Sequence, residues 1–256
     1  MKRLRFVFVL LAAACASALN AAPKEQAIEF ANGLGSAVLY TPRGSKARSG
    51  VIVIHEWWGL NDYARGRARQ LAEEGYAAIA VDMYGHGKVA SHPEDATAFM
   101  QAALAEPEKM NARFNAAKAE LLKLKKVEQV FAIGYCFGGA VVLNQARMGN
   151  DLAGVASFHG SLGTEQPAEE GAIKAKVLVA TGGADPMVPP KQVGDFVTEM
   201  GQAGAQLELL SFPGVLHSFT NPGATAKGKE TGLPVAYDAA ADKASWNALL
   251  RFLKDG

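Results

Sequence analysis

Residues 130–139 read Val-Phe-Ala-Ile-Gly-Tyr-Cys-Phe-Gly-Gly, and this stretch decides the fold. Its first four residues are apolar, as in a buried strand of a parallel sheet. The small, apolar stretch at 140–146 follows and predicts a helix. A glycine–x–nucleophile–x–glycine turn between a strand and a helix is the nucleophile elbow of α/β hydrolases, here with cysteine in the place of serine. The pattern predicts that Cys136 is a nucleophile at the edge of the sheet.

The glycines of this turn have a physical reason. The nucleophile of an elbow occupies a tight, strained turn, where flanking side chains would collide with the neighbouring strand and helix. The turn also directs amides of the helix N-terminus at the sulfur, which favours the reactive thiolate. The alternative interpretation is a buried, inert cysteine after a glycine-rich turn.

Apolar runs and amphipathic stretches alternate on both sides of the elbow. Further strands are predicted at 51–54, 77–81, 155–158, 177–180 and 207–212, with a weaker opening hairpin at 27–30 and 37–40. Helices are predicted at 62–74, 110–124, 193–200 and 246–253. This alternation predicts an α/β-hydrolase fold, a doubly wound, mostly parallel sheet with helices on both faces. The Gly- and Lys-rich residues 221–234 predict a mobile surface loop.

An acid and a histidine follow the nucleophile in the order that this fold requires. Asp185 lies just after the strand at 177–180, and His217 lies just after the strand at 207–212. Because the carboxyl ends of parallel strands share one edge of the sheet, both residues can reach Cys136. The order and placement predict a Cys136–His217–Asp185 triad. Taken singly, Asp185 could cap a turn and His217 could be a surface histidine.

The loop after the first apolar strand reads His55-Glu56-Trp57-Trp58-Gly59. In this fold it supplies the second oxyanion donor, here the Trp57 amide, and the first is the Phe137 amide next to the nucleophile. Glu56 could hold a proton for the thiol or take one up when substrate arrives, or it could be a solvated loop residue. The two tryptophans could line an apolar pocket or pack into the core. His55 and His159 flank strands and are expected to be structural.

Composition bounds the function. The chain has 256 residues, of which 49% are hydrophobic and 20% charged, and its formal net charge is +1. One larger α/β domain, over residues 23–256, fits this length. With no long block of like charge, nothing favours nucleic acid or a charged membrane surface as a partner. Five scattered histidines do not suggest a metal site.

The N-terminus predicts export. A basic start and an apolar run at 6–14 precede small residues, which is the layout of a signal peptide over residues 1–22. The run is too short to span a bilayer. The mature protein is then expected in the periplasm or outside the cell, without a membrane association and with Cys136 as its lone cysteine. A lipoprotein anchored through Cys15 and a buried N-terminal helix are the alternatives.

These motifs together resemble the dienelactone hydrolase family, also called carboxymethylenebutenolidases, from about residue 25 to residue 254. The resemblance implies an ester or lactone hydrolase that uses no metal or organic cofactor, with Cys136 as nucleophile and with Asp185 and His217 completing the triad. It also implies that Glu56 pairs with the thiol and governs its ionisation.

One departure from the family bears on the substrate. Known members hold the substrate carboxylate with arginines, one after the strand that matches 77–81 and one after the histidine. The corresponding stretches here are 83–86 and 218–221, and neither contains arginine. A dienelactone would therefore lack its charge-assisted clamp. We expect Trp58, Tyr84 and Phe219 to contact the substrate instead.

Two other functions stay open from the sequence. A thioesterase or an acyl-peptide hydrolase would use the same machinery, because the triad serves any acyl transfer. A protein without catalytic activity could keep the fold and use the pocket to bind a ligand. Retention of all three triad residues disfavours the second alternative.

Overall fold

The computed structural model describes residues 22–43 and 47–254, so the predicted signal segment lies outside the described residues except for Ala22. The described chain forms one sheet of eight strands in the order β1-β2-β4-β3-β5-β6-β7-β8. The pairs β1–β2 and β2–β4 are antiparallel, and all other neighbours are parallel. The strands are β1 (Lys24–Glu29), β2 (Ser36–Thr41), β3 (Ser49–Ile54), β4 (Ala77–Val81), β5 (Gln129–Tyr135), β6 (Gly154–Phe158), β7 (Lys176–Gly182) and β8 (Leu207–Phe212).

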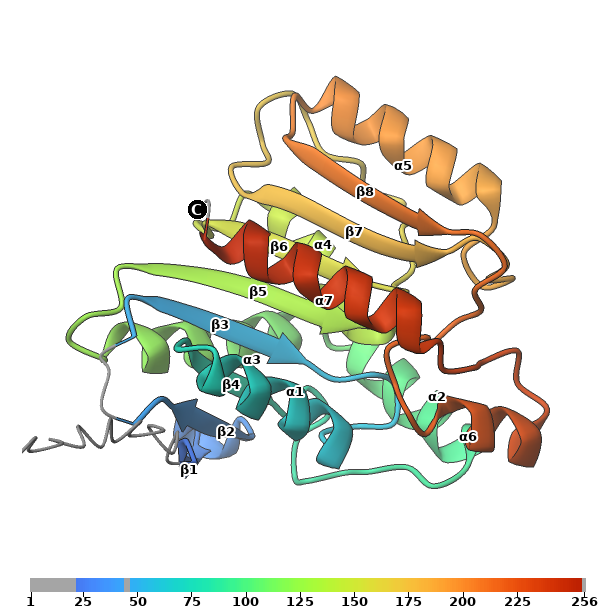
Figure 1. Ribbon diagram of the computed structural model, residues 1–256. Helices are drawn as coiled ribbons and strands as arrows, with labels where there is room; N and C mark the ends of the chain where they lie inside the picture. Colours follow the sequence, from blue (N-terminus) through green and yellow to red (C-terminus); the bar gives the residue numbers. More distant parts are fainter. Residues whose placement is uncertain (1–21, 44–46, 255–256) are drawn as a thin grey trace, which may run out of the picture.

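Helices cover both faces of this sheet (Figure 1). The helices α1 (Asp62–Glu73) and α7 (Ala239–Lys254) bury their apolar faces in one core. The helices α3 (Pro107–Leu122), α4 (Phe137–Arg147) and α5 (Pro190–Gln202) contribute to the core on the other side. The doubly wound, mostly parallel sheet that the sequence predicts is thus confirmed.

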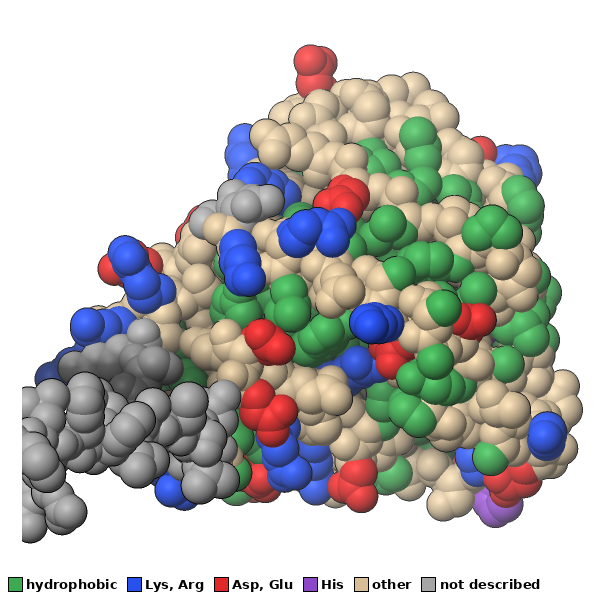
Figure 2. Space-filling view, in the orientation of Figure 1, with side chains coloured by type: hydrophobic (Ala, Val, Ile, Leu, Met, Phe, Trp, Pro, Cys, Tyr) green, Lys and Arg blue, Asp and Glu red, His purple; other side chains and the backbone are tan. Residues whose placement is uncertain are grey.

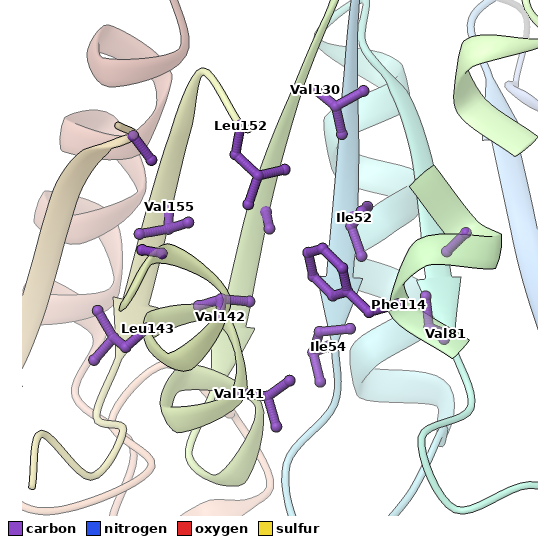
Figure 3. Close-up of a cluster of buried hydrophobic side chains, with 14 of the residues drawn as sticks. Ile52, Ile54, Val81, Phe114, Val130, Val141, Val142, Leu143, Leu152 and Val155 are labelled. Atoms are coloured by element: carbon purple, nitrogen blue, oxygen red, sulfur yellow. The ribbon is translucent and has the colours of Figure 1, made fainter. Parts of the chain in front are cut away.

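The core under α4 fixes the helix that carries the nucleophile (Figure 3). Ile52 and Ile54 of β3 lie in one buried cluster with Phe114 of α3 and with Val141 and Val142 of α4. Each side chain of this kind contributes about 1.5–3 kcal/mol when it is removed from water. The N-terminus of α4, directly after Cys136, is therefore held rigidly against the central strands.

Two helices were not predicted. The stretch expected to be a mobile loop contains α6 (Ala224–Thr231), and α2 (Pro93–Leu104) has no predicted counterpart. Two tertiary contacts hold α6 in place. The Ala224 side chain is buried, and the Lys227 ammonium donates a hydrogen bond to Ser91 O in another loop. The sequence of α6 shows no apolar periodicity from which a helix could be predicted. A helix this short depends on tertiary contacts for its stability. The start of α2 does carry sequence signals, a proline at its first turn and two acidic residues.

The parallel strands bring four loops to one edge of the sheet. Glu56 follows β3, Cys136 follows β5, Asp185 follows β7 and His217 follows β8. These strands are neighbours or near neighbours in the sheet, and they all run in the same direction. No helix in the described part of the chain is both long and apolar enough to cross a membrane.

Candidate active site

The turn at Cys136 has the strained backbone of an elbow. Cys136 has φ 53° and ψ −115°, a region that residues with a Cβ rarely occupy. A Cβ on Gly134 would lie 2.0 Å from Gly138 O, and a Cβ on Gly138 would lie 2.4 Å from Ile54 O. Both glycines are therefore required by backbone that cannot move away. The Cys136 side chain itself is only partly buried.

His217 and Asp185 meet beside this turn. The Nδ1–H of His217 donates a hydrogen bond of 2.7 Å to Asp185 Oδ2, and both side chains are buried. The other carboxylate oxygen of Asp185 accepts a bond of 2.8 Å from the Met187 amide. These contacts orient the imidazole and leave its Nε2 without a hydrogen-bond partner among the described residues. That nitrogen is thus available for proton transfer.

Electrostatics favour a charged His217. Burial alone would lower the pKa of its imidazole, but the Cys136 and Asp185 side chains raise that pKa to about 10. A histidine with a raised pKa stays protonated through neutral pH. The imidazole is therefore placed to donate a proton from Nε2 at neutral pH.

Two backbone amides beside the elbow, those of Phe137 and Trp57, have no acceptor among the described residues. Phe137 is the first residue of α4, so its N–H has no intrahelical partner. Neither that N–H nor the Trp57 N–H makes a hydrogen bond among the described residues. The Gly138 amide donates to His55 O at 3.1 Å, which ties the elbow to the Trp57 loop. Two free amides on adjoining rigid turns can hold an oxyanion.

Tyr84 supports this oxyanion loop rather than a pocket wall. Its hydroxyl donates to Trp57 O at 2.9 Å, and its ring packs against His55 and Phe137. Burial raises the pKa of its phenol, so the hydroxyl remains a donor. The sequence predicted that Tyr84 contacts substrate, whereas in the structure its hydroxyl is hydrogen-bonded to the backbone of Trp57.

Glu56 is buried and bonded to the loop that carries the histidine. Ser218 Oγ donates to Glu56 Oε1 at 2.8 Å, and Asn221 Nδ2 donates to Glu56 Oε2 at 2.6 Å. Among the described residues, no hydrogen bond joins this carboxylate to Cys136. Burial raises the pKa of Glu56, although these two bonds oppose the rise. Of the two sequence interpretations, a solvated loop residue is wrong, and the predicted direct pairing with the thiol is not formed in this structure.

We predict that Glu56→Gln lowers turnover by about 10- to 1,000-fold, the span of an acid–base contribution. Glutamine can keep its Oε1 toward Asn221 Nδ2 and donate its Nε2–H to Ser218 Oγ, so both contacts can persist while the charge and the capacity to take up a proton are lost. Kinetics across the pH range provide the measurement, and Glu73→Gln, on the exposed face of α1, is the control. A Glu56→Gln profile equal to the wild type at every pH would refute the role.

Of the three residues predicted to contact substrate, Trp58 lines a hollow at the surface, whereas Tyr84 and Phe219 do not. Trp57 and Trp58 line a hollow of about 230 Å³ that opens to solvent, together with Asn221 and Lys227. Phe219 does not line it: the ring is fully buried and packs on Phe212 and His159. Ser218, its neighbour in the sequence, does line the hollow. The expectation that Phe219 contacts substrate is therefore wrong.

Sequence reasoning missed the residues that complete this site. Ser218 and Asn221 were considered only as places where arginines are absent, yet they hold Glu56. Lys227 and Ala224 belong to α6, which was expected to be a loop. The signal that could have found Ser218 and Asn221 is their position directly after the catalytic histidine candidate.

Comparison with known proteins gives the family. A model of the dienelactone hydrolase family matches residues 36–256. The chain belongs to the dienelactone hydrolase family. Protein usf of Aquifex pyrophilus is 28% identical over 240 residues, which cover 87% of this chain and 99% of that protein. A Saccharolobus solfataricus protein named "Putative carboxymethylenebutenolidase" is 30% identical, over 85% of this chain and 93% of its own length.

Solved structures agree with this assignment. The dienelactone hydrolase-like promiscuous phosphotriesterase P91 from metagenomic libraries superposes with a TM-score of 0.83 at 32% identity, and covers 92% of this chain and 99% of that chain. A dienelactone hydrolase homologue from Klebsiella pneumoniae, at 19% identity and a TM-score of 0.74, shows the shared fold alone. The protein is thus a dienelactone hydrolase-like hydrolase with the α/β-hydrolase fold.

Proposed function

We propose that the protein hydrolyses a small carboxylic ester or lactone with Cys136 as its nucleophile and without a cofactor. One observation supports this function above the others. A partly exposed cysteine on a strained elbow adjoins two free amides and a histidine that Asp185 orients at 2.7 Å. A protein that only binds a ligand would need none of these features together.

Acylation follows from this geometry. The Cys136 thiolate attacks the carbonyl carbon, and the electron pair of the carbonyl bond moves to oxygen, where the Phe137 and Trp57 amides stabilise it. The tetrahedral intermediate then collapses and breaks the bond to the alkoxide. The His217 imidazolium gives this leaving group its Nε2 proton, so an alcohol departs and a thioester remains on Cys136.

Deacylation uses the same groups in reverse. Neutral His217 takes a proton from water, and the hydroxide adds to the thioester carbonyl. Collapse of the second intermediate releases the acid and regenerates the thiolate beside the imidazolium. Asp185 fixes the tautomer and orientation of the ring through its bond to Nδ1–H. A lactone passes through the same steps, with its alcohol tethered to the acyl group.

The proposed reaction is tested by a burst experiment. With 4-nitrophenyl acetate in excess, the enzyme should release a rapid burst of about one 4-nitrophenolate per site, followed by slower turnover. Blocking the thiol with iodoacetamide should remove both phases. A protein that only binds ligands would show neither phase before treatment.

The hollow beside Trp57 is suited to an apolar, planar part of the substrate. Trp57 carries one oxyanion amide, and its ring meets Trp58 edge to face at 5.0 Å. Trp58 and Tyr63 supply further aromatic surface, and Ala224 of α6 closes one side. A substrate whose carbonyl oxygen binds the Trp57 amide would place one arm along this aromatic surface. We therefore expect a higher kcat/KM for esters with an aromatic ring in the acyl or the alcohol part than for alkyl acetates.

We predict that Ala224→Leu reduces kcat/KM for 4-nitrophenyl phenylacetate by about tenfold relative to 4-nitrophenyl acetate. Ala224 is buried and lines the hollow, so a larger side chain occupies the volume of the ring, whose burial contributes about 1.5–3 kcal/mol. Ala226→Leu, on the exposed side of the same helix, is the matched control. Equal losses on both substrates would exclude the hollow as the acyl subsite.

A second candidate function is phosphotriester hydrolysis. It is favoured by the likeness to the phosphotriesterase P91, which extends over 92% of this chain. The thiolate would attack phosphorus and expel an alkoxide or aryloxide, which takes a proton from His217, while the two amides hold the phosphoryl oxygen. Water activated by His217 would then cleave the P–S bond and release the phosphodiester. Comparing kcat/KM for diethyl 4-nitrophenyl phosphate with that for 4-nitrophenyl acetate ranks the two functions. A higher value for the phosphate would reverse our order.

We further propose that the protein is exported with removal of its N-terminal segment. The support is the basic start, the apolar run and the small residues before position 23. Protein purified from its native cells should begin between about residues 19 and 23. An intact Met1 would contradict export, and a lipid on Cys15 would indicate an anchored protein instead.

Figure 2 shows charged side chains of both signs scattered over one face, without a block of one sign.

A further inference from the structure

A second histidine lies directly behind His217. His159 follows β6 at the same edge of the sheet and is fully buried. Its ring meets the His217 ring edge to face, with centroids 5.1 Å apart and an interplanar angle of 65°. It also contacts the buried ring of Phe219 at 5.2 Å. The His217 imidazole is therefore supported by Asp185 at one nitrogen and by His159 against its ring.

The same side chain holds the loop that carries His217. His159 Nε2 and Thr220 Oγ1 are hydrogen-bonded at 2.7 Å, and Thr220 Oγ1 is also bonded to the Tyr63 hydroxyl at 2.6 Å. The guanidinium of Arg67 donates to Thr220 O and, at 2.5 Å, to Asp242. Thr220 is three residues after His217, so these bonds fix the path of the loop immediately after the catalytic ring.

The backbone at His159 indicates that its side chain is needed. His159 has φ 41°, in the left-handed region that is unfavourable for residues with a Cβ. Glycine would occupy this conformation without strain. The contacts of the imidazole with His217, Phe219 and Thr220 are what offset the strain of placing a histidine there.

We propose that His159 is a positioning residue, which holds the His217 ring in line between Asp185 and Cys136 by backing that ring and by fixing Thr220. This inference rests on the proposed function of the triad. The charged groups that face His159 are His217 and Arg67, and Tyr135 lies beside it. Burial, reinforced by these two cations, lowers the pKa of His159 well below its usual value. The ring is therefore neutral and can support an imidazolium without repelling it.

Two substitutions test the proposal through the same hydrogen bond. Thr220→Val removes the hydroxyl but keeps the shape, and His159→Phe keeps a ring but removes Nε2. Each should lower kcat for 4-nitrophenyl acetate about tenfold, equivalent to about 1.4 kcal/mol, with KM changed less than about twofold. The double variant should lose less activity than the product of the two single losses, because both substitutions remove the His159–Thr220 bond, while Thr220→Val also removes the bond to Tyr63.

Matched variants separate positioning from packing. Thr181→Val also removes a buried hydroxyl near this edge of the sheet, but that hydroxyl has no hydrogen-bond partner among the described residues, so kcat should be unchanged. His159→Gln, which offers an amide nitrogen to Thr220, should recover part of the activity lost in His159→Phe. Thermal unfolding of each variant shows whether a change in kcat comes from loss of folded protein.

A spectroscopic readout follows His217 itself. The NMR signal of its Nδ1–H, which is bonded to Asp185, should titrate near the pKa of about 10 in the wild type. In Thr220→Val the titration should move to lower pH, because a misaligned ring loses part of its interaction with Cys136 and Asp185. A folded Thr220→Val protein with wild-type kcat and titration would overturn the proposal. If the wild type hydrolysed no ester at all, the proposed function would fail instead.

Discussion

Cys136→Ala is expected to reduce hydrolysis of 4-nitrophenyl acetate by about 10⁴-fold or more, to near the rate without enzyme. Removal of a nucleophile leaves only what the oxyanion amides and binding contribute. Cys136→Ser should keep a small residual rate, because a hydroxyl in the same place can still be activated by His217. The measurement is a steady-state assay on protein whose fold has been checked by circular dichroism.

The fold should tolerate this substitution. Cys136 is partly exposed, and alanine has the same Cβ and therefore the same strained backbone at φ 53°. Gly138→Ala serves as the contrasting variant, because its Cβ would lie 2.4 Å from Ile54 O and would disrupt the elbow. Loss of activity in Cys136→Ala with a wild-type unfolding temperature assigns the effect to chemistry.

His217→Ala is expected to be nearly as damaging, with a fall of about 10³- to 10⁴-fold. The substitution removes the proton donor and acceptor at Nε2, and it leaves the carboxylate of Asp185 buried without its 2.7 Å partner. The double variant with Cys136→Ala should be hardly slower than either single variant, because triad members act as one unit. Strictly additive losses in this cycle would mean that the two residues act independently.

The stability of the two variants should differ. His217→Ala leaves a buried charge unpaired, which costs on the order of 1–3 kcal/mol, whereas Cys136→Ala leaves none. His92→Ala, which removes an exposed imidazole outside the triad, controls for the loss of a histidine. Chemical denaturation of the three proteins provides the comparison.

The elbow could be predicted from the sequence because its cause is local. A strand, a turn and a helix follow each other within a few residues, and the positions of Gly134 and Gly138 are set by backbone approach alone. The places of Asp185 and His217 followed from a rule on parallel strands, which is equally independent of side-chain detail. These features needed only the order of elements along the chain.

The direction of individual side chains could not be predicted in the same way. The orientation of Glu56 depends on hydrogen bonds from Ser218 and Asn221, more than 160 residues later in the chain. Phe219 lies close to His217 in sequence, yet its ring is buried against Phe212 and His159, which belong to other parts of the sheet edge. Tyr84 was placed against substrate, but its hydroxyl is bound to Trp57 O.

The helix α6 illustrates another limit. Ala224–Thr231 contains Gly228, which disfavours a helix, and Gly232 ends the helix with φ 74°. The helix is stable because Ala224 is buried and Lys227 lies over the Trp58 ring. Its contribution to the hollow beside Trp57 therefore depends on tertiary packing, which no local pattern contains.

The central claim is that Cys136 carries the acyl group during turnover. Wild-type protein is mixed with excess 4-nitrophenyl acetate, quenched in acid during the burst, digested and examined by peptide mass spectrometry. The account predicts one added acetyl group on the peptide that contains Cys136, and none on that peptide in Cys136→Ala. An acetyl group on another residue during the burst, with Cys136 unmodified, would contradict it.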